Sequence, residues 1–173
     1  MPITKIVSGG QTGADRGGLD AAIYCKIHNG GWCPQGRKAE DGIIPEKYQL
    51  QETSSSGYLP RTEANVVDSD FTLIFTIGKL SGGSLKTMEF AKKHQRPALH
   101  IDLGGLSREE TVKSIVKWLA EKVTKPTPPL NCALNVAGQR ESKACGIQKK
   151  VQAIMVDVLI KTNPECKGFY PFI

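Results

Sequence analysis

Short apolar runs alternate along this chain with longer segments in which apolar residues recur at the helical period. Apolar runs rich in β-branched residues predict strands, and a period of 3.6 residues predicts helices. We predict strands within residues 3–8, 30–36, 48–52, 72–77, 97–102 and 133–136. We predict helices over residues 15–27, 61–68, 84–94, 107–123 and 146–162.

Alternation of strands and helices is typical of βαβ units and a mostly parallel sheet. The pattern therefore predicts an α/β fold, a Rossmann-like doubly wound sheet flanked by helices. The run 72–77 is the most apolar and is expected to be a central strand. The length of 173 residues suits a single domain, which we expect to span residues 1–173.

Local signals mark several boundaries. Ser107 followed by Glu110 is a capping-box pattern, which predicts the start of a helix. The proline-rich residues 125–130 are expected to form a rigid connector. The aromatic residues 169–173 are expected to dock on the domain or on a neighbouring subunit.

Composition excludes several classes of protein. Hydrophobic residues make up 39% of the chain and charged residues 23%, an ordinary globular composition. No apolar run approaches the roughly 18 residues of a membrane span, and the N-terminus shows no signal peptide. We therefore expect a cytoplasmic protein that does not engage a membrane.

The charge pattern favours a small anionic ligand. The chain carries 23 basic and 17 acidic residues, a net charge of +6, without a block of like charges. This pattern argues against nucleic acid as a partner, whereas a mild positive field concentrates small anions. The five cysteines are scattered and odd in number, so we expect reduced thiols and no metal site.

In open parallel sheets, ligands bind beyond the carboxyl ends of the strands. Three predicted strand exits combine glycine with polar residues: 9–16, 78–89 and 138–143. We therefore place the candidate site at these three segments.

The first exit predicts an anion cradle, because glycines next to a helix N-terminus let backbone N–H groups approach phosphate. It contains Gly9, Gly10, Gln11, Thr12 and Gly13, with Arg16 available to balance charge. It lacks the Lys-Ser/Thr pair of a P-loop and the spacing of a dinucleotide fingerprint. A tight turn that needs glycine only for packing is the alternative.

An NAD-binding protein would also need an acidic residue after the second strand. This chain has Gly36-Arg37-Lys38 there. Arg37 suits a phosphate or another oxyanion, although a solvated charge pair is the alternative.

The second exit resembles another phosphate cradle. Gly82, Gly83 and Ser84 open a helix, and Glu89 could point back across the same crevice, although a helical glutamate is usually only solvated. In the third exit, Arg140 could bind phosphate with two parallel hydrogen bonds. Trp32 could stack on a flat heterocycle or pack in the core.

Long ordered motifs resemble the putative molybdenum carrier family, which lies within the wider group of Rossmann-like proteins that includes the lysine-decarboxylase-like nucleotide phosphoribohydrolases. The motifs are Ser8-Gly9-Gly10-Gln11-Thr12-Gly13-Ala14-Asp15-Arg16, Gly31-Trp32-Cys33-Pro34, Ala39-Glu40-Asp41-Gly42, Arg61-Thr62, Asp68-Ser69-Asp70, Leu134-Asn135-Val136-Ala137-Gly138 and Arg140-Glu141-Ser142-Lys143. The resemblance implies self-association into dimers or tetramers. It also implies binding of molybdenum cofactor, a phosphorylated pterin, with molybdoenzymes as partners.

A shorter motif resembles the hydrolase relatives. Gly82, Gly83 and Glu89 match their Gly-Gly-x-Gly-Thr-x-x-Glu pattern, in which the glutamate belongs to the active site. Leu85 and Lys86 replace the second Gly and the Thr of that pattern.

Three functions follow from these observations. The first is a carrier that holds molybdenum cofactor, or another phosphorylated heterocycle, without converting it. The second is a hydrolase of nucleoside monophosphates, in which Glu89 acts on the ribose or on water and Asp15 or Arg61 orients the substrate. The third is a nucleotide sensor or scaffold whose aromatic tail contacts a partner.

Overall fold

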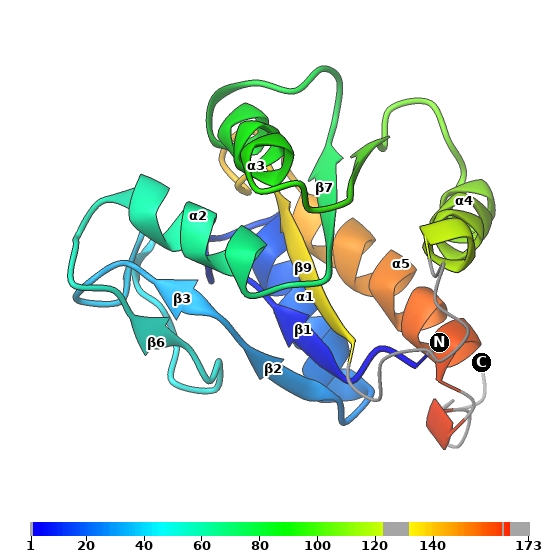
Figure 1. Ribbon diagram of the computed structural model, residues 1–173, viewed down its shortest axis with the longest axis horizontal. Helices are drawn as coiled ribbons and strands as arrows, with labels where there is room; N and C mark the ends of the chain where they lie inside the picture. The colour runs from blue at the N-terminus through cyan, green and yellow to red at the C-terminus, as the bar shows by residue number, and fades with distance from the viewer. Residues whose placement is uncertain (1, 123–131, 164, 167–173) are drawn as a thin grey trace.

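The computed structural model describes residues 2–122, 132–163 and 165–166. Five strands form one parallel sheet in the order β2-β1-β9-β7-β8 (Figure 1). They are β1 (Lys5–Val7), β2 (His28–Gly30), β7 (Phe71–Thr76), β8 (Ala98–Asp102) and β9 (Ala133–Gly138).

Helices cover both faces of this sheet. On one face α5 (Ile147–Thr162) packs between α1 (Ala14–Tyr24) and α4 (Arg108–Lys122). On the other face α2 (Tyr58–Val67) packs against α3 (Gly82–Lys93), as Figure 1 shows. The predicted Rossmann-like α/β fold is confirmed.

The main core lies between the sheet and the layer of α1, α4 and α5. All six residues of β7 are buried, as expected for a strand covered on both faces. In α5, Val151, Met155 and Val158 follow the helical period and are fully buried. Phe71 of β7 contacts Trp118 of α4 edge to face, with the ring centroids 5.9 Å apart.

Two small ribbons extend one end of the sheet. One pairs β3 (Trp32–Cys33) with β6 (Gln51–Glu52) in parallel, and the other pairs β4 (Lys38–Ala39) with β5 (Gly42–Ile43) antiparallel. The strand expected around Trp32 and Cys33 therefore exists but belongs to a ribbon. The second strand of the main sheet is β2, which ends two residues before Trp32.

Other sequence predictions are confirmed with shifted boundaries. The Ser107 capping box forms, with the Ser107 N–H donating to Glu110 Oε2 at 2.9 Å and the Glu110 N–H donating to Ser107 Oγ at 3.2 Å. Helix α2 begins at Tyr58, three residues before the predicted start at residue 61. Strand β7 lies inside the sheet as expected, but its middle strand is β9.

Some predictions concern residues that the structure does not describe, or features it tests only within the described ranges. The proline connector 125–130 and the aromatic tail 169–173 lie outside the described residues. In the described part, no helix is long and apolar enough to cross a membrane. All five cysteines are unpaired, and burial raises the pKa of Cys25 to about 11 and that of Cys132 to about 12.

Two helical glycines give a matched test of packing. A Cβ on Gly18 of α1 would lie 2.6 Å from Val136 Cβ, whereas a Cβ on Gly83 of α3 would meet no atom within 4 Å. We expect Gly18→Ala to lower the free energy of unfolding by about 1 kcal/mol, because overpacking exceeds the gain in helix propensity. Gly83→Ala should raise it by about 0.5 kcal/mol. Urea denaturation measures both changes, and equal stabilisation by the two variants would contradict this packing.

Candidate functional site

The three predicted strand exits meet at one edge of the sheet. Because β9 lies between β1 and β7 and all three are parallel, the segments after these strands lie next to one another. A cleft of about 890 Å³ opens there between α2, α3 and the segment after β9. Its polar lining includes Gln11, Asp15, Tyr58, Arg61, Asn65, Ser81, Ser84, Lys86, Thr87, Asn135, Gln139, Arg140 and Lys143.

The N-terminus of α3 faces this cleft. Gly82 and Gly83 line it, and neither has protein atoms within 4 Å of the position a Cβ would take. A capping box closes the first turn: the Ser81 side chain accepts the Ser84 N–H, and the Ser84 hydroxyl accepts a hydrogen bond from Ser81 N at 3.3 Å and donates to Ser81 O at 2.7 Å. The N–H groups left for a ligand are those of Gly82 and Gly83. The first N–H groups of a helix have no partner within it, so this end of α3 can bind an anion.

The N-terminus of α1 is covered by the protein's own chain. The Ala14 N–H donates to Gln139 O at 3.0 Å, and a Cβ on Gly13 would lie 2.4 Å from the same oxygen. A Cβ on Gly10 would lie 2.5 Å from Leu50 Cδ1. The glycines of the first exit thus permit close packing, the alternative that the sequence left open, and the segment after β9 occupies the expected cradle.

Gly9 makes room for a buried ion pair. A Cβ on Gly9 would lie 1.6 Å from Arg61 Nη1, so only glycine lets the guanidinium lie on this turn. Arg61 Nη1 donates to Asp15 Oδ2 at 3.0 Å, and the two side chains are 12% and 5% exposed. Burial raises the pKa of Asp15, although the charge of Arg61 opposes that shift.

A model of the circularly permutated YpsA SLOG family matches residues 6–159 of the chain. The chain belongs to this family. It is also similar to the crystal structure of a putative molybdenum carrier protein from Syntrophus aciditrophicus SB, with a TM-score of 0.83 and 46% sequence identity. That match covers 91% of this chain and 95% of the other. A comparison with curated proteins gives no match.

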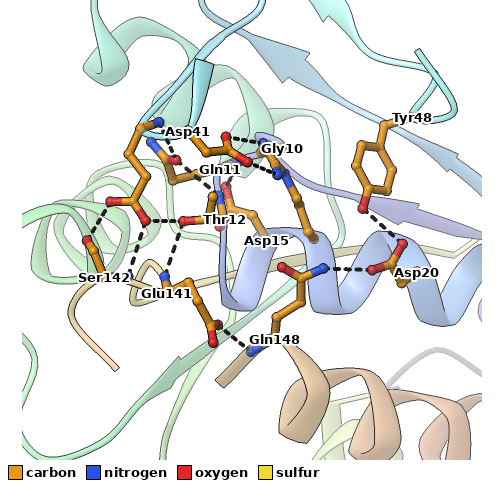
Figure 2. Close-up of polar contacts among 12 residues, drawn as sticks. Gly10, Gln11, Thr12, Asp15, Asp20, Asp41, Tyr48, Glu141, Ser142 and Gln148 are labelled. Atoms are coloured by element: carbon orange, nitrogen blue, oxygen red, sulfur yellow. Dashed lines mark hydrogen bonds and ion pairs between the residues drawn. The ribbon is translucent and has the colours of Figure 1, made fainter. Parts of the chain in front are cut away.

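In this member of the YpsA SLOG family, Glu40 clamps the segment after β9 to the turn after β1. Its partners Thr12 and Ser142 are labelled in Figure 2. Its carboxylate accepts hydrogen bonds from the Thr12 hydroxyl, from Ser142 N at 3.2 Å and from Ser142 Oγ at 2.5 Å. Arg140 Nη1 lies 3.6 Å from Glu40 Oε2. Thr12 therefore does not line the cleft; through Glu40 it holds in place the segment after β9, which does.

Two arginines that the sequence assigned to a ligand bind the protein itself. Arg16 forms two parallel hydrogen bonds with Asp41, at 2.6 and 2.7 Å, which lower the pKa of that carboxyl. Arg37 donates to four backbone carbonyls, those of Ile44, Pro45, Tyr48 and Leu50. Both guanidiniums hold residues 37–50 in place through these hydrogen bonds, and neither lines the cleft.

Trp32 and Glu89 also lie outside the cleft lining. The Trp32 indole N–H donates to Asp68 Oδ2 at 2.7 Å, and the ring lines a separate hollow beside β2. Glu89 is exposed on α3 and pairs with Lys86 at 2.7 Å.

The structure thus divides the residues that the sequence singled out. It brings these to one cleft: Gln11, Asp15, Arg61, Gly82, Gly83, Ser84 and Arg140. It places these elsewhere: Gly9, Gly10, Thr12, Gly13, Arg16, Trp32, Arg37 and Glu89.

Sequence reasoning missed other lining residues. Lys86 and Lys143 lie inside the second and third exits, so their position along the chain could have suggested them. Tyr58 lies on α2 three residues before Arg61, but the predicted helix began at residue 61, so Tyr58 itself carried no signal. Among the described residues, no group of three or more His, Cys, Asp or Glu side chains could hold a metal ion.

The Glu40 clamp predicts a pH-dependent stability. Burial raises the pKa of Glu40, but hydrogen bonds from Ser142 and Thr12 outweigh that effect and lower it. A carboxyl whose pKa is lowered by folding stabilises the protein above its usual value of 4.5, and the benefit is lost as the pH falls through the folded-state pKa.

We therefore expect Glu40→Gln to lower the free energy of unfolding at pH 7 by about 1 kcal/mol, with a difference that shrinks below pH 4.5. Urea denaturation across this pH range measures the effect. Glu121→Gln is the control, because among the described residues Glu121 has one ion-pair contact, an exposed one of 3.9 Å with Lys117. Equal stability of Glu40→Gln and the wild type at pH 7 would contradict the clamp.

Proposed function

We propose that this chain binds molybdenum cofactor, or its pterin precursor, in the cleft between α2 and α3 and holds it without converting it. The observation that carries this proposal is the open N-terminus of α3 on a large cleft of positive character. The cofactor is cargo in this proposal, bound through its phosphate and its pterin ring.

The cleft suits a ligand of this size and shape. Its volume of about 890 Å³ falls within the ~300–1,000 Å³ of small-molecule sites. Tyr58, Leu59 and Pro60 supply an apolar wall on α2, against which a flat pterin can lie. Gly82 and Gly83 on α3 supply N–H groups for a phosphate.

The charges of the lining favour an anion. Four cationic side chains line the cleft: Arg61, Lys86, Arg140 and Lys143. Asp15 is the one carboxylate among the described lining residues, and Arg61 neutralises it. Lys86 and Arg140 also have carboxylate partners, Glu89 at 2.7 Å and Glu40 at 3.6 Å, but those carboxylates do not line the cleft. The lining is therefore mildly positive, which favours a phosphorylated ligand and agrees with the chain's net charge of +6.

The structural relative supports a molybdenum-carrier-like role through its name. Because 46% of residues are identical over 91% of this chain, the two proteins share one architecture. We infer the ligand, molybdenum cofactor, from that name together with the size and lining of the cleft. A carrier of this kind implies that the cofactor is passed on to molybdoenzymes, which are then its partners.

The hydrolase and the sensor remain alternatives with less support. The hydrolase needs Glu89 at the substrate, whereas Glu89 is exposed, pairs with Lys86 and is not part of the cleft lining. Asp15 is buried and held by Arg61, which suits a structural role more than proton transfer. The sensor depends on residues 169–173, which lie outside the described chain.

A retention assay tests the proposal. Purified protein is mixed anaerobically with molybdopterin and passed over a desalting column, and bound pterin is then oxidised and measured by fluorescence. We expect the wild type to retain pterin. We expect Gly83→Val to retain it about tenfold more weakly, because the added side chain covers the α3 N–H groups and removes a charge-assisted hydrogen bond.

Gly105→Val is the matched control. Gly105 also has no atoms within 4 Å of a Cβ position, but it lies outside the cleft lining. This variant should retain pterin like the wild type. Absence of retention by the wild type, or release of free base from nucleoside monophosphates, would contradict the proposed function.

A further inference from the structure

Two residues that line the cleft each carry a buried N–H donor without an acceptor in the described part of the protein. Gln11 Nε2 and Arg61 Nε are enclosed and make no hydrogen bond within the described part of the protein. Both side chains line the cleft, and Gln11 is 7% exposed. Buried donors in native proteins nearly always have partners, which makes these two the candidates for an acceptor on a bound molecule.

The orientation of the Gln11 amide is fixed by its neighbours (Figure 2). Gln11 Oε1 accepts hydrogen bonds from Thr12 N at 3.0 Å and from Glu40 N at 2.9 Å. Both neighbours are donors, so rotating the amide by 180° would set its NH₂ group against two N–H groups. The Nε2 donor is therefore the atom left without an acceptor.

The Arg61 guanidinium is equally constrained. It lies on Gly9, where a Cβ would be only 2.9 Å from Nε, and Nη1 is held by Asp15 Oδ2. The same Asp15 oxygen accepts the Gln11 N–H at 3.3 Å. One carboxylate thus links the backbone of Gln11 to the side chain of Arg61, and the two unpaired donors belong to one rigid assembly.

This assembly has no surplus charge. Arg61 is paired with Asp15, and Gln11 is neutral, whereas Lys86, Arg140 and Lys143 lie on other elements of the cleft. A neutral acceptor, such as a carbonyl oxygen, satisfies two N–H donors without adding a buried charge. A second phosphate here would bring uncompensated negative charge next to Asp15.

We infer that Gln11 Nε2 and Arg61 Nε form a subsite that binds a keto oxygen of the ligand's heterocycle, apart from the phosphate position at α3. This inference rests on the proposed function and specifies its substrate class: a phosphorylated heterocycle that carries a carbonyl group. A pterin has such a carbonyl. Inorganic phosphate and simple sugar phosphates lack a heterocyclic carbonyl and can use only the α3 position.

Two conservative variants remove these donors. Arg61→Lys keeps a cation for Asp15 but has no Nε–H group, and Gln11→Glu keeps an acceptor for Thr12 N and Glu40 N but cannot donate when ionised. Their controls are Arg108→Lys, on the exposed start of α4, and Gln35→Glu, an exposed position that gains the same charge. Thermal unfolding of each variant verifies that it is folded.

The experiment titrates each protein with molybdopterin and, separately, measures displacement of molybdopterin by inorganic phosphate. We expect Arg61→Lys and Gln11→Glu to bind molybdopterin at least tenfold more weakly, with the affinity for phosphate changed less than twofold. Both controls should match the wild type. Equal loss for molybdopterin and phosphate, or unchanged molybdopterin binding in folded variants, would overturn the subsite.

The result also separates this inference from the proposed function. If the wild type does not bind molybdopterin, the proposed function fails and the subsite fails with it. If the wild type binds and the donor variants bind equally well, only the subsite is overturned.

Discussion

The site depends on the position of one strand. β9 is the last strand in the described part of the chain, yet it lies in the middle of the sheet, paired with β1 on one side and with β7 on the other. This insertion brings three strand exits to one edge, and it lets Gln139 cover the N-terminus of α1. The cleft therefore forms only when residues 133–138 are paired within the sheet.

The helix N-termini of α1 and α3 both adjoin glycine-rich exits at this edge of the sheet, and they differ in what covers them. The start of α1 is filled from within by Gln139 and is crossed by the Arg61 guanidinium. The start of α3 remains open beside Gly82 and Gly83. Buried donors that are unsatisfied until a ligand arrives lower stability, and sites that break local rules in this way are usually functional.

Much of the fold could be predicted from the sequence, because apolar periodicity reports which faces are buried. The apolar run before Gly78 predicted the buried strand β7, and the Ser107–Glu110 pattern predicted the start of α4. Both predictions are confirmed. The pairing of Trp32 with Gln51 was not predictable in this way, since the partner strand is distant in sequence and periodicity does not encode pairing.

The candidate site was predictable only in part. A glycine-rich exit has the same sequence whether a ligand or the protein's own chain fills it, so Gly9 and Gly13 could not be distinguished from Gly83. The partners of Arg16 and Arg37 lie in an irregular loop without periodic signal. The close approach of Arg61 to Gly9 is a tertiary contact between α2 and the first turn.

A crystal structure of the protein with bound molybdopterin tests the central claim most directly. We predict phosphate density within hydrogen-bonding distance of the backbone N–H groups of residues 82 and 83, with the pterin ring lying between α2 and the turn after β1. Ligand density at the hollow beside Trp32, or anywhere outside the cleft between α2 and α3, would contradict it.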